Sequence, residues 1–368
     1  MKLTARIIAI TFISIFPSLS CLAKVWSVAD FGAKGDGQTL DTEAIQSAIA
    51  SEDTIRILGV GNSWTRDSMR WLSAIATSAG KNVIVGHAYL GGSNLWEQYY
   101  GIDDKTFTYL HFGKEQVVHN TYQYWKYEGT EDPVKTPSDA EGYNNGFAGI
   151  GVTLESVVTD EPWDIIVFQP HILLRYHMPQ YIGFDINDLV ARIKAMMAPD
   201  VAEKVVCGIM IPFSYPEGNT DCRQSVIDAY NNGVRPSDQE GLDALYEKMH
   251  NWIQEDAVRL AAHMGENCSF SINVGQAIYN ARKNPMLSKF GYRFQRAIDN
   301  THLAAGIPMY VASLCFAYSL LDIEPKDISF YPQISAVVSP QGEKSTVSVS
   351  ISEAEQAKQE AWRICSNK

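Results

Sequence analysis

The sequence lacks several features that would assign it to a functional class at once. It has 30 basic and 42 acidic residues and a formal net charge of -12, and no basic cluster stands out, so we predict no nucleic-acid partner. Beyond the N-terminal segment, no apolar run is long enough to span a bilayer. The few cysteines show no spacing typical of a zinc site, and we predict neither a metal nor a cofactor.

What remains is an ordinary globular composition. The chain has 368 residues, of which 46% are hydrophobic and 20% are charged, enough for one sizeable core or two small ones. If the chain is exported, disulfides are permitted. Cys207 and Cys315 lie in apolar runs and are expected to be buried thiols, whereas Cys222 and Cys268 are better disulfide candidates, with no pairing deducible from sequence.

The first residues are predicted to lie outside the fold. A basic start precedes the apolar run of residues 7–16, and small residues follow, a pattern typical of a secretory signal peptide over residues 1–23 with cleavage after Ala23. Alternatively, Cys21 is a lipidated first residue that attaches the protein to a membrane. Either way we expect an exported protein, periplasmic or at the cell surface.

Residues 24–50 form a separate N-terminal segment. A Gly/Asp-rich turn cluster at residues 30–41 is followed by a short amphipathic helix over residues 42–50. The segment resembles the N-terminal motif of right-handed β-helix pectinases, in which such a helix caps the core. No stack of short strands follows, and a solenoid needs several repeats. We therefore interpret it as an accessory segment; a pectinase or lyase is an alternative that depends on this segment alone.

From residue 54 onward, apolar runs of strand length alternate with helical patterns. This alternation predicts an α/β domain over residues 54–368, with a parallel sheet covered by helices on both faces. Residues 96–150 form an aromatic-rich insertion, and two strands are expected within residues 322–350. The expected strands are residues 55–60, 82–88, 164–168, 204–212 and 269–274. The expected helices are residues 69–79, 241–264 and 303–320, and a last helix that starts at Ser352 with Glu355 completing a capping box.

Ser63 follows the first predicted strand and precedes a helix. Side chains at the C-terminal ends of parallel strands face the ligand site in such sheets. A serine needs a base to become a nucleophile, and the base needs a group that orients it. The segment by itself is equally compatible with a serine that only caps the helix.

His302 follows Asp299 by three positions, ahead of an apolar run. This spacing lets the carboxylate reach one imidazole nitrogen while the other points outward. The alternative is a polar surface turn, or a helix start capped by Asp299.

Two further positions come at strand ends between these segments. Gly92 follows the second strand, where glycine lets backbone N–H groups approach a ligand, although an ordinary turn is equally compatible. Gln169 ends the third strand and carries an amide donor suited to an oxyanion, or is a polar edge residue. His171 and His177 are rival imidazoles, for which a structural role is the simpler interpretation.

The order of these segments resembles the SGNH (GDSL-like) hydrolase superfamily, in particular a bacterial subgroup whose first block is Gly-Asn-Ser. The first block corresponds to residues 61–64, the second to 91–93, the third to 163–169 and the last to 299–303. Residues 273–277 resemble a Pro-Val-Gly-Glu-Ala segment of that subgroup. The resemblance implies a flavodoxin-like three-layer α/β/α sandwich with a parallel central sheet, a small β-rich insertion and a C-terminal extension.

The same resemblance implies a serine esterase mechanism. Ser63 would attack an ester carbonyl, His302 would take its proton and Asp299 would orient the imidazole. The backbone N–H groups of Ser63 and Gly92 and the side chain of Gln169 would form the oxyanion hole. No metal is required.

The aromatic insertion offers rings that could stack on sugars, although packing within a hairpin is the simpler explanation for most of these residues. Trp64, Trp96 and Tyr99 are the candidate substrate-binding residues. We expect an exported O-acetylesterase that acts on an acylated polysaccharide or oligosaccharide. The alternative is a non-catalytic glycan-binding protein on the same scaffold, because the third block departs from the superfamily pattern.

Overall fold

The chain divides into two units, Met1–Asp53 and Thr54–Lys368. Only Lys34 of the first unit is described, so the predicted signal peptide, Cys21 and the pectinase-like segment lie outside the described residues. The computed structural model describes residues 54–102, 106–111, 114–119, 122–128, 151–219, 224–290, 294, 301–338 and 344–366 of the second unit, excluding the side chains of residues 101, 106–128, 151–152, 225, 288, 338 and 344.

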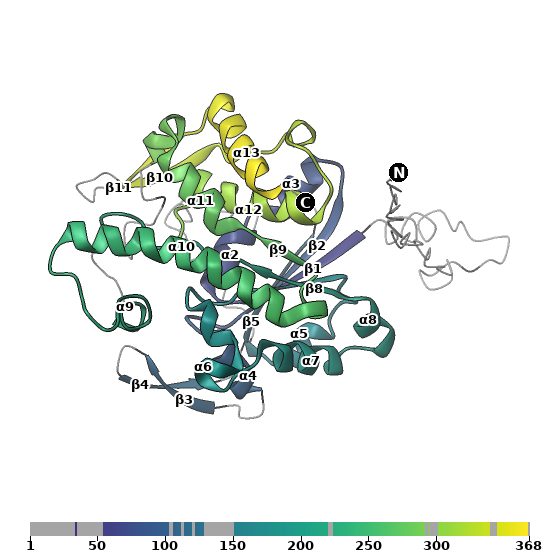
Figure 1. Ribbon diagram of the computed structural model, residues 1–368. Helices are drawn as coiled ribbons and strands as arrows, with labels where there is room; N and C mark the ends of the chain where they lie inside the picture. Colours follow the sequence, from purple (N-terminus) through teal and green to yellow (C-terminus); the bar gives the residue numbers. More distant parts are fainter. Residues whose placement is uncertain are drawn as a thin grey trace, which may run out of the picture. The chain divides into compact units, whose positions relative to one another are not determined.

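A seven-stranded sheet forms the centre of the second unit (Figure 1). Five strands are parallel, in the order β2 (Asn82–Tyr89), β1 (Thr54–Gly61), β7 (Ile165–Phe168), β8 (Val206–Met210) and β9 (Phe270–Ile272). Numbered along the chain, this is the order 2-1-3-4-5 that flavodoxin-like folds share. The five predicted strands are thereby confirmed, with shifted ends.

Two antiparallel strands extend the sheet beyond β2, namely β5 (Tyr122–Glu128) and β6 (Gly151–Val152). The predicted insertion is therefore not wholly separate, because β5 pairs with β2 along six residue pairs from Ile84 to Tyr89. The insertion also contributes a two-stranded hairpin of β3 (Thr106–His111) and β4 (Lys114–His119). Its residues 129–150 lie outside the described part.

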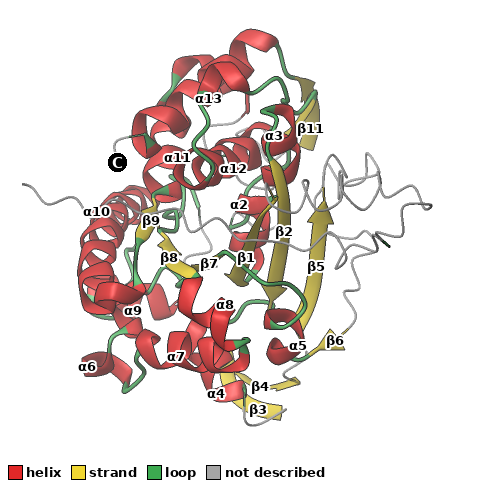
Figure 2. Ribbon diagram, turned by 90° about the vertical axis from the view of Figure 1, so that its right-hand side faces the viewer, coloured by secondary structure: helices red, strands yellow, loops and turns green. Residues whose placement is uncertain are grey.

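Helices cover both faces of the sheet and make three layers (Figures 1 and 2). One face carries α2 (Ser63–Met69), α3 (Leu72–Ser78), α11 (Val274–Lys283), α12 (Ile307–Leu320) and α13 (Ile351–Cys365). The other carries α4 (Leu95–Gly101), α5 (Leu154–Val158), α7 (Ile186–Met196) and α8 (Pro199–Lys204). The long helix α10 (Gln239–Met264) lies at the edge of the sheet that ends with β9 (Figure 2). The remaining short elements are α6 (Pro179–Ile182), α9 (Gln224–Asn231), and the 3-10 turns Leu174–His177, Gly265–Asn267, Pro285–Phe290 and Pro325–Asp327.

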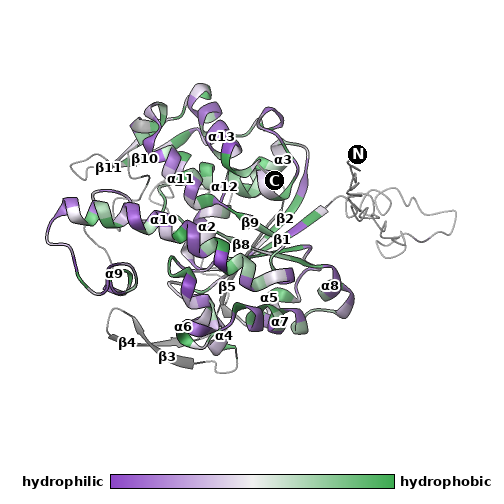
Figure 3. Cartoon of the chain, in the orientation of Figure 1, coloured by the Kyte–Doolittle hydropathy of each residue, from purple (hydrophilic) through white to green (hydrophobic). Residues whose placement is uncertain are grey.

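The core lies on both faces of the sheet and includes buried residues of α12 on one face and of α5 and α7 on the other. Every residue of α12 from Ile307 to Tyr318 is buried, as expected for a helix that is apolar on all sides. In contrast, α10 and α13 alternate between hydrophilic and hydrophobic residues, because only one side of each faces the protein (Figure 3).

Three predicted helix boundaries are wrong. The predicted helix over residues 69–79 is two helices, because the backbone N–H of Trp71 donates to Ser313 Oγ at 3.0 Å instead of continuing α2. The helix expected from residue 303 starts only at Ile307, because Gly306 has a φ of 92°, which is not helical. The last helix is capped by Ser350 with Glu353, rather than by Ser352 with Glu355.

The cysteines and the C-terminal strands follow the predictions in part. Cys207 and Cys315 are buried free thiols, as predicted, whereas Cys268 is also a free thiol and Cys222 lies outside the described residues. The two strands expected near the C-terminus form a hairpin of β10 (Ile334–Val338) and β11 (Lys344–Ser348). Within the described ranges, no helix is long and apolar enough to cross a membrane.

Candidate active site

Ser63 lies at the C-terminal end of β1, next to the topological switch point of the sheet. On one side of β1 is β2, and on the other is β7, where the strand order reverses; ligands of such sheets bind at this position. The helix cap is Asn62, whose Oδ1 accepts from Trp64 N at 3.0 Å, so Ser63 is the first helical residue rather than the cap. Its N–H belongs to the first turn and is not used by the helix.

The turn before Ser63 requires glycine. A Cβ atom on Gly61 would lie 2.2 Å from Thr65 Oγ1 and 2.9 Å from Gln169 Oε1. Any side chain here would push β1 away from the first turn of α2, so Gly61 lets the strand turn directly into the helix and brings Ser63 to the sheet edge.

Ser63 and His302 meet, although they are 239 residues apart in the chain. The Nε2 atom of His302 lies 2.6 Å from Ser63 Oγ, and in the tautomer with Nδ1 protonated the hydroxyl donates to Nε2. Thr301 Oγ1 lies 3.3 Å from His302 Nδ1. Asp299, the predicted acid, lies outside the described residues. In this arrangement an imidazole nitrogen is placed where it can accept the proton of a serine hydroxyl.

The C-terminal hairpin holds the chain that carries His302. Ser335 Oγ, on β10, donates to the carbonyl of Ala305 at 3.0 Å and accepts from the N–H of Ile307 at 3.2 Å. A Cβ atom on Gly306 would lie 2.4 Å from Ser335 Cα, so the two segments are in close contact. Ser335 thereby fixes the three residues that lead from the His302 loop into α12.

Replacing Ser335 by alanine tests this support. Ser335 is fully buried, and its loss would leave the Ala305 carbonyl and the Ile307 N–H without these bonds. We expect Ser335→Ala to lower the free energy of unfolding by about 1–3 kcal/mol, measured by urea denaturation. Ser345→Ala, at an exposed position of the same hairpin, is the matched control and should change it by less than about 0.5 kcal/mol. Equal effects of the two substitutions would contradict the assigned role.

Gly92 lies beside Ser63 because the ends of β1 and β2 are tied together. Asn62 Nδ2 donates to the carbonyl of Ser93 at 2.9 Å, and the N–H of Leu90 donates to the carbonyl of Gly61 at 3.0 Å. Gly92 itself has a φ of 69°, in the left-handed region that favours glycine. The structure thus places the second predicted block next to the first.

An open depression with a volume of about 140 Å³ lies over the Ser63–His302 pair. Its size suits a small acyl group rather than a long chain. Seven residues line it, namely Asn62, Ser63, Trp64, Tyr89, Gly92, His171 and His302. Tyr89 was not among the residues predicted from sequence, although its place at the last position of a strand, just before the Gly91-Gly92 turn, is a usable signal.

Gln169 does not line this depression. Its side chain is buried beneath the turn that precedes Ser63, where Oε1 accepts from Asn62 N and from Thr65 Oγ1, each at 3.1 Å. Its Nε2 donates to the carbonyl of Pro170 at 2.8 Å. The arrangement therefore does not support the prediction that Gln169 donates to an oxyanion; Gln169 instead fixes the turn that presents Ser63.

The two rival histidines have different positions. His171 lines the depression, and its ring stacks on Trp64 with centroids 5.7 Å apart and planes 22° apart. His177 is fully buried, its Nδ1 lies 3.2 Å from the carbonyl of Leu174, and burial lowers its pKa to about 4. His177 is therefore a neutral structural residue at pH 7.

Of the three predicted substrate-binding aromatic residues, one lines the depression and two do not. Trp64 lines the depression and stacks on Phe213 at 4.4 Å between centroids. Trp96 packs against Tyr176 and His177, and Tyr99 packs against Phe184, so neither lines the depression. The sequence alone did not show which of the three would line the depression, because the residue type does not reveal whether an aromatic side chain faces a pocket or packs against other rings.

The described residues contain no group of three or more His, Cys, Asp or Glu side chains placed to hold a metal ion. The side chains at the site offer a hydroxyl beside an imidazole, with backbone N–H groups at the adjacent turns.

Comparisons with known proteins bear on the fold. No family model and no curated protein matches the chain. Among solved structures, the crystal structure of a DUF4886 family protein from Bacteroides uniformis is similar, with 18% sequence identity and a TM-score of 0.56. The match covers 86% of this chain and 97% of the other. At this identity the likeness concerns the three-layer α/β fold alone.

Proposed function

We propose that the protein is an exported serine esterase of the SGNH type, and that it removes O-acetyl groups from a polysaccharide or oligosaccharide. The observation that carries the proposal is the 2.6 Å approach of His302 Nε2 to Ser63 Oγ at the C-terminal edge of a flavodoxin-like sheet. Export rests on the N-terminal pattern of the sequence, and the acetyl group on the limited volume of the depression.

In this mechanism the hydroxyl of Ser63 attacks the ester carbonyl carbon while its proton passes to His302 Nε2. The tetrahedral intermediate collapses, the bond to the sugar oxygen breaks, and that oxygen takes the proton from His302. Water, deprotonated by His302, then attacks the acyl-enzyme, releases acetate and restores Ser63. Asp299 is proposed to orient the imidazole from the chain just before Thr301.

The oxyanion requires donors on the open side of Ser63. We assign the backbone N–H groups of Ser63 and Gly92 to this role, since both residues line the depression. The side-chain donor is assigned to His171, which follows β7 in the chain and lines the depression. Gln169 is not assigned to this role, because its Nε2 donates to the carbonyl of Pro170.

A pair of substitutions tests the role of His171. His171→Gln keeps an N–H donor and His171→Leu removes it. We expect His171→Leu to lower kcat about 100-fold with KM little changed, and His171→Gln to retain most of the rate, because the donor acts on the charge that develops in the transition state. His263→Gln, at a partly exposed histidine paired with Asp185, is the control. Equal rates for the Leu and Gln variants would remove His171 from the oxyanion hole.

The function itself is tested by treating the mature protein with a fluorophosphonate and locating the label by mass spectrometry, together with assays on acetylated oligosaccharides. We expect a single label on Ser63 and release of acetate. The absence of both would leave the second candidate, a glycan-binding protein without turnover, which the inward-turned Gln169 favours. That candidate predicts glycan binding that survives His302→Ala.

A further inference from the structure

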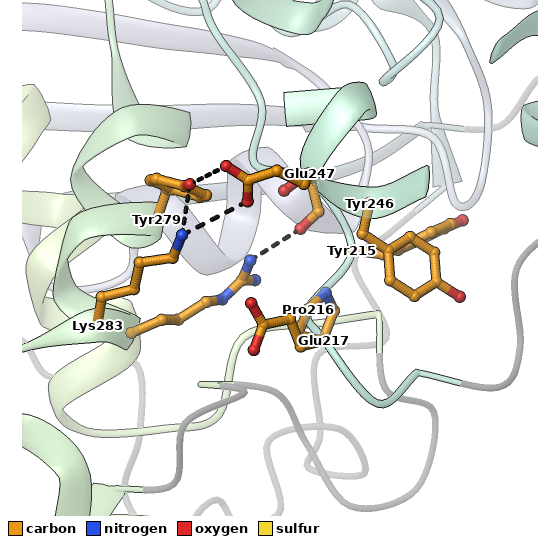
Figure 4. Close-up of a pocket in the computed structure, with 9 residues that line it drawn as sticks. Tyr215, Pro216, Glu217, Tyr246, Glu247, Tyr279 and Lys283 are labelled. Carbon is orange, nitrogen blue, oxygen red and sulfur yellow. Dashed lines mark hydrogen bonds and ion pairs between the residues drawn. The ribbon is translucent and has the colours of Figure 1, made fainter. Parts of the chain in front are cut away.

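A second depression, with a volume of about 50 Å³, lies between the loop that follows β8 and the helices α10 and α11 (Figure 4). The loop contributes its wall from Ser214 to Glu217, α10 contributes Tyr246 and Glu247, and α11 contributes Tyr279, Arg282 and Lys283. This volume accommodates a group of a few heavy atoms, such as a carboxylate, and is too small for a whole sugar ring.

Two of the four charges in this depression neutralise each other. Lys283 Nζ lies 3.4 Å from Glu247 Oε2, and the Tyr279 hydroxyl donates to the other oxygen of Glu247, as Figure 4 shows. Burial acts to raise the pKa of Glu247, but the Tyr279 hydrogen bond and the charge of Lys283 outweigh it and lower that pKa. This pair therefore adds fixed polar groups but little net charge.

Arg282 is a partly buried cation of the depression. Its Nη1 donates to the carbonyl of Ser214 at 3.1 Å, which holds the guanidinium against the loop. Burial lowers the pKa of Arg282 to about 9, while the exposed carboxylate of Glu217 acts in the opposite direction. The group is still a cation at pH 7 and therefore attracts a carboxylate that enters the depression.

An aromatic pair joins this depression to the one at Ser63. Tyr215 lines the second depression, and the edge of its ring meets Trp64, with centroids 6.5 Å apart and planes at 82°. Trp64 in turn lines the first depression. The linings of the two depressions therefore touch through one pair of rings.

We propose that the depression at Arg282 binds the carboxylate of an acidic sugar in the alcohol part of the substrate, so that the preferred substrates are acetylated glycans containing uronic acid. The inference rests on the proposed function for the ester and adds the charge of the sugar. A guanidinium suits this role because its planar fork matches a carboxylate in two parallel hydrogen bonds. Glu217, which is exposed, would share the guanidinium with the ligand and weaken its binding.

Binding is measured without turnover, in Ser63→Ala, by calorimetry with two probes that differ only at the carboxyl group: an oligogalacturonate and its fully methyl-esterified form. We expect the acid form to bind about tenfold more tightly. Adding Arg282→Gln should abolish that preference. Arg363→Gln, which removes a 62% exposed arginine on α13, should leave the preference unchanged. Equal binding of the two probes by Ser63→Ala would overturn the inference.

A second variant, at the exposed Glu217, keeps the inference testable if the Arg282 variant does not fold. Glu217→Gln removes the competing carboxylate, so we expect tighter binding of the acid form by about threefold and no change for the methyl ester. Weaker or unchanged binding of the acid form would also overturn the inference. Because these measurements need no hydrolysis, a protein without esterase activity that still prefers the acid form would refute the proposed function and leave the second site standing.

Discussion

Ser63→Ala is expected to lower kcat for an acetyl ester by at least about 1,000-fold, the largest effect of any single change in this chain. The reason is that the acyl-enzyme cannot form without Oγ, and only the donors around the carbonyl remain to assist water. The structure should be unaffected, because the cap of α2 is Asn62 and the removed hydroxyl makes its bond to His302. A short-chain nitrophenyl ester and an acetylated oligosaccharide are both suitable substrates.

Two controls make the Ser63 experiment decisive. Ser269→Ala, at an exposed position beside β9, should keep the wild-type rate. Equal far-UV circular dichroism and denaturation midpoints for Ser63→Ala and the wild type would exclude unfolding as the cause. Wild-type activity in Ser63→Ala would show that the serine is only a residue in the first turn of α2.

His302→Ala is expected to cost nearly as much, and the two losses should not add. Both side chains act on the same proton, so removing the second group costs little once the first has gone. We expect a loss of about 1,000-fold for His302→Ala and a double variant with Ser63→Ala that is within about threefold of the slower single variant. The comparison requires kcat values for all four proteins with one substrate.

The double-variant result separates two explanations. If the losses multiplied, Ser63 and His302 would act independently, and the 2.6 Å contact would be a structural hydrogen bond rather than the path of a proton.

Much of the fold could be predicted because buried parallel strands correspond to continuous apolar runs in the sequence. The run before Gly61 and the run before Gln169 each became a strand of the central sheet, and neighbouring strands of such a sheet end at the same edge. That rule also predicted that Ser63 would lie at this edge. The meeting with His302 needed one further premise, the resemblance of the ordered blocks to a hydrolase pattern.

The inward direction of the Gln169 side chain has a physical reason. A strand end defines where a residue lies, but the direction of a long side chain depends on which partners are nearby. Gln169 finds the Asn62 N–H and the Thr65 hydroxyl beneath the turn, so it points inward, and His171 two positions later lines the depression. Neither partner is visible from the sequence around Gln169, since both come from the strand–helix turn more than 100 residues earlier.

The broken helix at Trp71 is a similar case. Residues 69–79 have helical composition, and propensity alone continues the helix. The break depends on Ser313, in the middle of α12, which accepts the Trp71 N–H. Local pattern cannot report a hydrogen bond to a residue 242 positions away.

The position of His302 beside Ser63 depends on a hairpin from the C-terminal part of the chain. Ser63 belongs to the first strand of the domain, but the loop of His302 is held by Ser335, almost at the end of the chain. Until the last strands have folded, the serine is an ordinary alcohol with no base beside it. If Ser63 and His302 act as proposed, a partly made or truncated domain would lack the base beside its serine, and activity would require the finished chain.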